Sequence, residues 1–443
     1  MRSDCQLDRE SRVAARTAWA SAGLALAACT IAASILNAQE WRQFRGPTGQ
    51  GVAEGADLPV QWSETSNVAW KISVPGRGWS SPVIAHGRVW LTTAVPDGRD
   101  ASLRLLSFDA ESGSAAQDVE IVRLQRAALL NAKNSHASPT PVVDDARVYV
   151  HFGSHGTAAV TLDGKVLWKA RHDCETQHGN GGSPVLHANL LIFACDGFDT
   201  AYVVALDAST GKQRWKTMRR DQWSQAYATP LVIRVGETDQ LVSPGAFYAG
   251  AYDPTTGREI WRVRYDDGFS NVPRPVFAHG LVFIATGFQQ PSMIAVRPDG
   301  KGDVTRTHVA WRVGRGAPFT PSPIVAGDHL YMVNDIGILT AVDARTGRLV
   351  WQQRVPGNYS ASPILAGGLM YVSSEEGVTT VIRPATTFEA VAVNRLDGEV
   401  LASPAVVGRS FYIRTADHLY RVTKTTSNGA LAHLSRAISS ISR

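Results

Sequence analysis

Hydrophobic and polar residues alternate in short runs along most of the chain, and Gly, Asp or Pro interrupts the runs every few residues. The segment from Pro323 to Val355 contains four such runs: a first apolar run that begins at Pro323, then "LYMVN", "ILTAVD" and "RLVWQQRV". These runs are separated by "AGDH", "DIG" and "ARTG". Runs of period two that are bounded by turn residues predict β-strands joined by hairpins. Proline fits the start of the first run because a missing N–H is tolerated there. The segment therefore predicts one antiparallel unit of four strands.

A phrase of eleven residues marks the turn between the third and fourth strands of three such units: "ALDASTGKQRW" from Ala205, "AYDPTTGREIW" from Ala251 and "AVDARTGRLVW" from Ala341. Its Asp and Thr can hydrogen bond to the turn backbone, and its Gly takes a positive φ without steric cost. We expect the final Trp to pack between neighbouring units. The predicted structural residues are Trp70, Trp168, Asp207, Gly211, Trp215, Asp253, Gly257, Trp261, Trp311, Asp343, Gly347 and Trp351.

A second mark, a proline that follows Ser, Thr or Arg and opens an apolar run, recurs at a spacing of 40 to 59 residues. It stands at Pro82, Pro141, Pro184, Pro230, Pro275, Pro323, Pro363 and Pro404. A period in the forties predicts four-stranded propeller blades. The last unit ends after three strands, whereas "NVAWKISV", residues 67–74, precedes the first. We therefore expect an all-β, eight-bladed β-propeller whose ring is closed by this N-terminal strand, because closure leaves no free sheet edge.

Residues 1–38 have the pattern of a targeting segment, because several arginines precede an uncharged stretch from Thr17 to Ala38. Three interpretations stay open: a signal peptide cleaved after Ala38, a lipoprotein signal "LAAC" that ends at Cys29, and a retained membrane anchor. Each predicts an exported chain, periplasmic or secreted. We expect the propeller to span residues 41–423 and a polar tail to span residues 424–443.

Composition and cysteine usage narrow the possible functions. Apolar residues make up 44% of the chain, and the net charge of +5 is not gathered into a run of Lys and Arg. Nucleic-acid binding is therefore not expected, since it needs a concentrated basic surface. Outside the leader the chain has two cysteines, Cys174 and Cys195. In an oxidising compartment they form either a disulfide or two unpaired thiols.

The repeated "AxDxxTGxxxW" phrase in an eight-unit propeller resembles the repeat of pyrroloquinoline-quinone (PQQ) quinoproteins. It equally resembles the repeat of the BamB-type outer-membrane assembly lipoprotein. This second resemblance implies a family that has the repeat but does not bind the cofactor. The segments "WRQFRGPTGQGVAEG" from Trp41, "WSSPV" and "CDGFDTAYVVALD" are similar to secreted bacterial PQQ-binding-like propeller proteins. The resemblance covers about Trp41 to Val422 and implies the fold more than the function, because the repeated residues are those that hold blades together.

In a propeller, the loops that enter each first strand gather at one mouth of the central channel. We expect the candidate ligand-binding residues there to be Arg77, Trp79, His136, His178, Trp223, Tyr227, Asn271, Arg274, Phe319 and Tyr359. Such a set suits a planar or anionic ligand, because guanidinium groups bind carboxylates and aromatic rings stack. Surface loops that carry aromatic residues without any ligand are the alternative.

The resemblance to quinoprotein dehydrogenases implies a calcium ion held by several oxygens and a carboxylate base. It also implies a disulfide between adjacent cysteines in the methanol-oxidising members, and this chain has no adjacent cysteines. The mouth loops hold few acids: Glu175, Asp221, Asp266, Asp267 and Glu399. The spacing of His136, His155, His172 and His178 fits no close metal-ligand pattern. We therefore assign no catalytic residue and no metal ligand.

These observations predict an exported propeller of the bacterial cell envelope that acts as a non-catalytic binding or scaffold protein. We expect its partner to be an envelope protein or a small ligand, for example a sugar. The propeller itself contacts the membrane only through an N-terminal anchor or lipid. No cofactor is expected. The alternative is a PQQ-dependent oxidoreductase, with calcium, that uses the same channel mouth.

Overall fold

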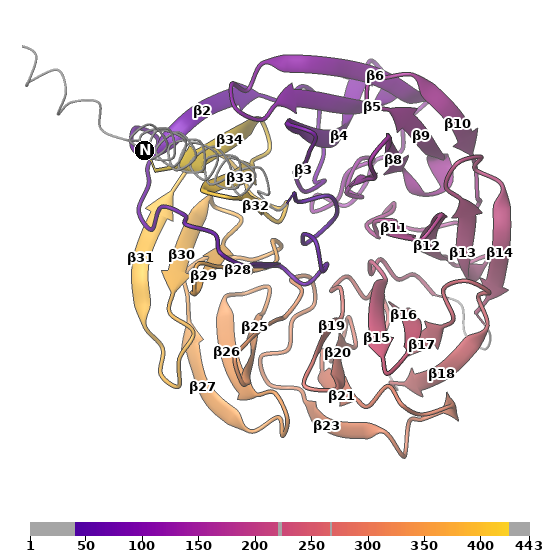
Figure 1. Ribbon diagram of the computed structural model, residues 1–443, viewed down its shortest axis with the longest axis vertical. Helices are drawn as coiled ribbons and strands as arrows, with labels where there is room; N and C mark the ends of the chain where they lie inside the picture. The colour runs from indigo at the N-terminus through magenta and orange to yellow at the C-terminus, as the bar shows by residue number, and fades with distance from the viewer. Residues whose placement is uncertain (1–39, 220–223, 266–267, 425–443) are drawn as a thin grey trace, which may run out of the picture. The chain divides into compact units, whose positions relative to one another are not determined.

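The computed structural model describes residues 40–219, 224–265 and 268–424. Their strands form eight antiparallel sheets around a central axis, so the all-β, eight-bladed propeller predicted from the repeats is confirmed (Figure 1). Neighbouring blades pack face to face through clusters of buried aliphatic and aromatic side chains. The predicted leader and tail lie outside the described residues, apart from Lys424. No helix in the described part of the chain is long and apolar enough to cross a membrane.

The blades follow one another along the chain, and each runs from an inner to an outer strand. The first three are β3 (Val83–Ala85), β4 (Arg88–Asp97), β5 (Asp100–Asp109) and β6 (Ala115–Leu124); β7 (Val142–Val143), β8 (Arg147–His151), β9 (Thr157–Thr161) and β10 (Val166–Ala170); and β11 (Val185–His187), β12 (Leu190–Asp196), β13 (Ala201–Asp207) and β14 (Gln213–Met218). The fourth and fifth are β15 (Leu231–Val235), β16 (Thr238–Pro244), β17 (Tyr248–Tyr252) and β18 (Glu259–Arg264); and β19 (Val276–Ala278), β20 (Leu281–Ala285), β21 (Met293–Val296) and β23 (Val309–Val313).

The last three blades are β24 (Ile324–Ala326), β25 (His329–Val333), β26 (Ile338–Asp343) and β27 (Leu349–Arg354); β28 (Ile364–Ala366), β29 (Leu369–Ser373), β30 (Val378–Ile382) and β31 (Ala390–Arg395); and β32 (Ala405–Val407), β33 (Ser410–Arg414), β34 (His418–Thr423) and β2 (Val68–Ser73). Two short strands extend two of these sheets: β22 (Gly302–Asp303) pairs with β18, and β1 (Val52–Ala53) pairs with β28. A 3-10 turn, η1 (Gly153–His155), joins β8 to β9.

The ring is closed by the N-terminal strand, as the sequence predicts. Strand β2 pairs antiparallel with β34, with Lys71 opposite Tyr420 and Ile72 opposite Leu419. It supplies the fourth strand that the last unit lacks. The eighth blade therefore combines residues from both ends of the propeller.

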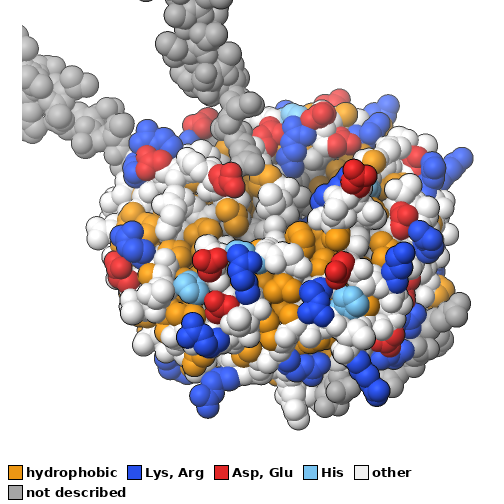
Figure 2. Space-filling model, turned by 60° about the horizontal axis from the view of Figure 1, so that its bottom comes forward, with side chains coloured by type: hydrophobic (Ala, Val, Ile, Leu, Met, Phe, Trp, Pro, Cys, Tyr) orange, Lys and Arg blue, Asp and Glu red, His pale blue; other side chains and the backbone are white. Residues whose placement is uncertain are grey.

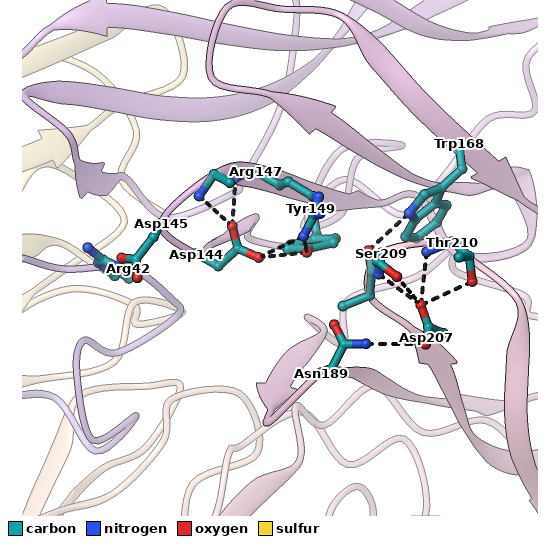
Figure 3. Close-up of polar contacts among 12 residues, drawn as sticks. Arg42, Asp144, Asp145, Arg147, Tyr149, Trp168, Asn189, Asp207, Ser209 and Thr210 are labelled. Atoms are coloured by element: carbon teal, nitrogen blue, oxygen red, sulfur yellow. Dashed lines mark hydrogen bonds and ion pairs between the residues drawn. The ribbon is translucent and has the colours of Figure 1, made fainter.

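The repeated phrase links the three blades that contain it to the blade before each. In the third blade, Oδ1 of Asp207 accepts hydrogen bonds from the backbone N–H groups of Ser209 and Thr210, as Figure 3 shows. The indole Nε1 of Trp168, in the second blade, donates to the carbonyl oxygen of Ala208 at 3.0 Å. The same indole-to-turn bond joins Trp215 to Pro254 and Trp311 to Ala344.

The glycine of the phrase lies flat against the indole of the preceding blade. Gly257 has a φ of +74°, and a Cβ at this position would lie 2.5 Å from the Trp215 ring. Gly211 and Gly347 have the same relation to Trp168 and Trp311. Trp and Gly therefore recur together because they meet across these three blade junctions.

Cys174 and Cys195 form a disulfide, which is one of the two states that the sequence left open for them. The bond ties the loop that enters the third blade to its second strand, β12. This loop carries Gln177 and His178, which line the channel mouth.

The segment from Trp41 to Gly55 enters the central channel, and we call it the plug. In Figure 1 it belongs to the indigo trace that lies between β3 and β28, near the centre of the ring. Trp41 exchanges backbone hydrogen bonds with Ile84 of the first blade, and β1 pairs with the seventh. The plug thus bonds to blades on different sides of the channel.

Candidate functional site

A ring of hydroxyl groups surrounds the channel where the first strands begin. The residue before the marked proline is Ser or Thr in seven of the eight blades. We call these seven residues the hydroxyl ring: Ser81, Thr140, Ser183, Thr229, Ser322, Ser362 and Ser403. Six of their hydroxyls accept a hydrogen bond of 2.9 to 3.0 Å from the backbone N–H of the corresponding residue one blade earlier. The ring therefore ties blade to blade and fixes the position of its oxygens.

Arg274 occupies the eighth position of this ring. Its backbone N–H donates to Ser322, so the link between these two blades is kept. Its guanidinium instead bonds the carbonyl oxygens of Pro230 and of Phe44, at the tip of the plug. Gly49 of the plug packs on this guanidinium, and a Cβ there would lie 2.4 Å from Nη1. Arg274 therefore holds the plug in the channel.

A cavity of about 610 Å³ lies at this mouth. All seven residues of the hydroxyl ring line it, and Phe44 is the plug residue that reaches it. Trp79, Tyr227 and Leu401 add apolar surface. Because the plug fills the channel beside this ring, the cavity is a cup with the ring and Phe44 as its floor.

Phenylalanine rings form one wall of the cup, which we call the phenylalanine wall: Phe269, Phe288 and Phe319. Their centroids follow one another at 5.7 Å and 5.3 Å. Phe288 is 48% exposed, so its ring is open to contact with a bound group. The wall offers apolar contact to a bound group.

Another part of the wall is polar. It includes the amide side chains of Asn131, Asn134 and Gln177, together with Lys133 and His178. Lys133 reaches from the connection between the first two blades to Glu375 of the seventh, with Nζ 2.8 Å from Oε1. This connection thus arches over part of the mouth.

Three fully buried arginines stand around the floor: Arg45, Arg274 and Arg414. Arg45 donates to the carbonyl oxygens of Ser322 and Pro323, and Arg414 donates to Ser80 and Thr92. Within the described residues, no carboxylate is ion-paired with any of the three. Burial lowers the pKa of each guanidinium to about 9, so all three stay charged at neutral pH.

The structure brings together four of the ten residues predicted for the mouth: Trp79, His178, Tyr227 and Phe319 line the cavity. Arg77 and His136 line a neighbouring cavity of about 640 Å³ under the β4–β5 hairpin. Arg274 belongs to the ring but is fully buried, whereas Trp223 lies outside the described residues.

Asn271 and Tyr359 are buried and do not line the cup, because their side chains bond to other parts of their blades. The side-chain amide of Asn271 donates to Ala285, and the hydroxyl of Tyr359 donates to the carbonyl oxygen of Pro356. Both residues therefore shape the loops at the mouth and do not line its cavity.

Sequence reasoning missed the hydroxyl ring, Phe44, Lys133, Phe269 and Phe288. The hydroxyl ring could have been predicted from the sequence, since Ser or Thr precedes seven of the eight marked prolines. Phe44 had a weaker one in the glycine-rich phrase "WRQFRGPTGQG". Lys133 had none, because only the fold carries its loop across the mouth.

Charged side chains do not gather by sign on the face seen in Figure 2, where Lys and Arg are interspersed with Asp and Glu. Of the acids considered for the mouth, Asp221, Asp266 and Asp267 lie outside the described residues. Glu175 and Glu399 are described, but neither lines the cavity. No group of three or more His, Cys, Asp or Glu that could hold a metal occurs in the ranges the structure describes.

The fold and the repeat define a PQQ-like propeller, and comparison with known proteins gives its family. A family model described as "Outer membrane protein assembly factor BamB" matches residues 50–216, 122–243 and 300–401, which span more than half of the chain. The chain belongs to this family.

Two curated relatives show how widely the repeat is shared. A quinohemoprotein alcohol dehydrogenase of Pseudomonas putida is 23% identical over 302 residues, which cover 61% of this chain and 40% of the relative. The outer membrane protein assembly factor BamB of Burkholderia pseudomallei is 28% identical over 210 residues, which cover 44% of this chain and 50% of the relative. The chain therefore spans half or less of the length of either relative.

Solved structures share the fold. BamB of Moraxella catarrhalis superposes with a TM-score of 0.55 at 12% identity, over 80% of this chain and 99% of that chain. A europium-containing methanol dehydrogenase gives a TM-score of 0.60 at 10% identity, over 86% of this chain and 90% of that chain. At such identities the likeness concerns the fold alone.

The described lining of the cup does not fit a PQQ–calcium pair. Calcium in proteins is held by six to eight oxygens, and carboxylates are prominent among them. The described lining residues offer hydroxyl and amide oxygens but no Asp or Glu. A base for proton abstraction would also have to be a carboxylate or another group of suitable pKa. We therefore derive no chemical step through this cofactor.

Proposed function

We propose that this propeller is an exported protein of the bacterial cell envelope that works by binding, not by catalysis. The mouth cavity receives either a segment of an envelope protein or a small ligand, and the rigid ring of blades presents the loops that recognise it. The similarity to proteins named as outer membrane protein assembly factors supports a role in the envelope.

The composition of the cup is the observation that carries this proposal. An exposed phenylalanine wall, a floor of hydroxyls and a wall of amides give apolar surface with convergent polar groups, as in binding sites generally. The described lining lacks carboxylates that could act as base or metal ligand. Such a site can hold a partner without transforming it.

Site-specific photo-crosslinking in the native cell tests the proposal. A photoreactive phenylalanine analogue replaces Phe288, which is 48% exposed on the phenylalanine wall. The matched control carries the same analogue in place of Val393, which is 67% exposed on the outer strand β31. We expect a discrete adduct from position 288 and none from position 393, identified by mass spectrometry. Equal labelling at both positions would refute a binding mouth, and no adduct at 288 would refute a protein partner there.

A quinoprotein oxidoreductase is the second candidate. The 23% identity to a quinohemoprotein alcohol dehydrogenase over 302 residues favours it. Calcium-dependent PQQ binding together with dye-linked alcohol oxidation by the full-length protein would establish this candidate in place of the first.

A further inference from the structure

The hydroxyl ring has donors that the fold does not use. A hydroxyl has one proton to donate and two lone pairs to accept. Six of the seven ring oxygens already accept a backbone N–H, which holds them in place. Across the described residues, no protein acceptor takes the proton of any ring hydroxyl, and all seven residues line the cup. The floor therefore presents a set of O–H donors to whatever occupies the cavity.

The three buried arginines place positive charge directly behind these donors. Arg45 donates to the carbonyl oxygen of Ser322, and Arg414 donates to Ser80, next to Ser81. The guanidinium of Arg274 donates to the carbonyl oxygen of Pro230, next to Thr229. Nε of Arg45, and Nε and Nη2 of Arg414, have no hydrogen-bond partner in the described part of the chain. Because the three guanidinium groups are buried, solvent screens their charges less than it would at the surface, and their field extends into the cavity.

The acidic side chains next to the walls are already engaged by donors of the protein. The charged side chain among the described lining residues is Lys133. Glu375 at the rim is engaged by Lys133 and by the hydroxyl of Ser360. Asp335 accepts the backbone N–H groups of Phe319 and Thr320. An anion in the cup would therefore meet donors below it and no unpaired described acid beside it.

The geometry points to a metal-independent binding site for an organic oxyanion. A carboxylate or phosphate head accepts O–H donors from the hydroxyl ring, and its apolar or aromatic body packs on the phenylalanine wall. Donors that converge on an ionised acceptor make stronger hydrogen bonds than neutral pairs do. No divalent cation is needed, because Arg45, Arg274 and Arg414 supply the balancing charge. The site deepens the proposed function and rests on it, since it names the ligand class of the same cavity.

Binding of matched aromatic probes to the purified full-length protein tests the site. Naphthoate and naphthyl phosphate carry the two candidate heads, and naphthamide is the neutral control of nearly the same shape. We expect at least one acid to bind about tenfold or more tightly than the amide, since hydrogen bonds to an ionised acceptor are stronger than those to a neutral one. Chelator should not change this ratio. Equal affinity for acid and amide, or binding that chelator abolishes, would overturn the inference.

Two threonines of the ring allow a volume-matched variant. The double variant Thr140→Val and Thr229→Val removes two hydroxyls and keeps their shape, whereas Thr140→Ser with Thr229→Ser keeps both hydroxyls. We expect the acid-to-amide ratio to fall to about threefold or less in the valine variant and to persist in the serine variant. An unchanged ratio in a folded valine variant would contradict the assignment of these donors. If the valine variant does not fold, the ratio in the unaltered protein decides the question.

Failure of this site and failure of the proposed function give different results. Adducts at position 288 together with equal binding of acid and amide would support the proposed binding function but contradict the oxyanion site. Selective binding of the acid without adducts would keep the site and argue for a small ligand in place of a protein partner.

Discussion

At the scale of single residues, the contact between Trp and Gly explains why one phrase recurs. The turn glycine of one blade is the position where the indole of the previous blade needs room. Its positive φ is a second requirement, since residues with a Cβ adopt it at a cost. The Asp and Thr of the phrase shape the same turn, so the four residues recur as a set.

Gly257→Ala tests this contact. The new Cβ would lie 2.5 Å from the Trp215 ring. Gly236→Ala is the matched control, because Gly236 also has a positive φ, of +57°, but nothing lies within 4 Å of its would-be Cβ. We expect Gly236→Ala to lower the free energy of unfolding by about 1 kcal/mol and Gly257→Ala by about 1–3 kcal/mol more. Equal losses in denaturant titrations would show that the indole contact contributes nothing.

The tryptophans themselves should differ in their contribution to stability. Trp261 is fully buried and donates its indole N–H to Gln240, whereas Trp351 is only half-buried. Trp261→Ala is expected to lower the free energy of unfolding by about 3–5 kcal/mol, and Trp351→Ala by less. A near-neutral Trp261→Ala would contradict its place between the blades.

Buried histidines make stability depend on pH. His151 is 1% exposed, and burial lowers its pKa to about 3 from an ordinary value near 6.5. Because the unfolded chain binds the proton more readily, its contribution is present above about pH 6.5 and is lost as the pH falls toward the folded pKa.

His151→Gln isolates this effect. The stability of the unaltered protein relative to the variant should fall by about 2 kcal/mol between about pH 7.5 and about pH 5. Denaturant titrations at the two pH values measure it. A constant difference between the two proteins would mean that His151 does not titrate with unfolding.

At the scale of elements, regular blades were predictable and the mouth was only partly so. The strands of the sixth blade were predicted from alternation, and β2 was predicted because the last unit lacked a fourth strand. Phe319 and Tyr227 reach the cup because their loops follow the regular pattern of the blades. Lys133 could not be predicted and Phe44 had only a weak signal, because a long connection and a plug reach the mouth from places that no repeat defines.

Strand β2 closes the ring of blades by pairing with β34. Deleting residues 67–74 should expose the edge of β34 and cause aggregation, because an unpaired edge recruits other strands. Size-exclusion chromatography and thermal unfolding measure the result. A soluble monomer as stable as the intact protein would show that closure is not required.

At the scale of the whole molecule, the propeller is a rigid ring that presents one cup at its mouth. The hydroxyl ring links blades around the channel, Arg274 holds the plug, and the plug forms part of the floor of the cup. The structural links and the binding surface therefore use the same residues. This sharing explains why the fold could be inferred from repeats while the ligand could not, since the repeats encode the blade junctions.

Calorimetric titration of the full-length protein with PQQ, with and without calcium, tests whether the cup binds without quinoprotein catalysis. We expect calcium to change nothing, so that any heat of binding is the same in its presence and in chelator. Calcium-dependent, one-to-one binding at about micromolar affinity or tighter would contradict a purely binding function and assign the cup to an oxidoreductase.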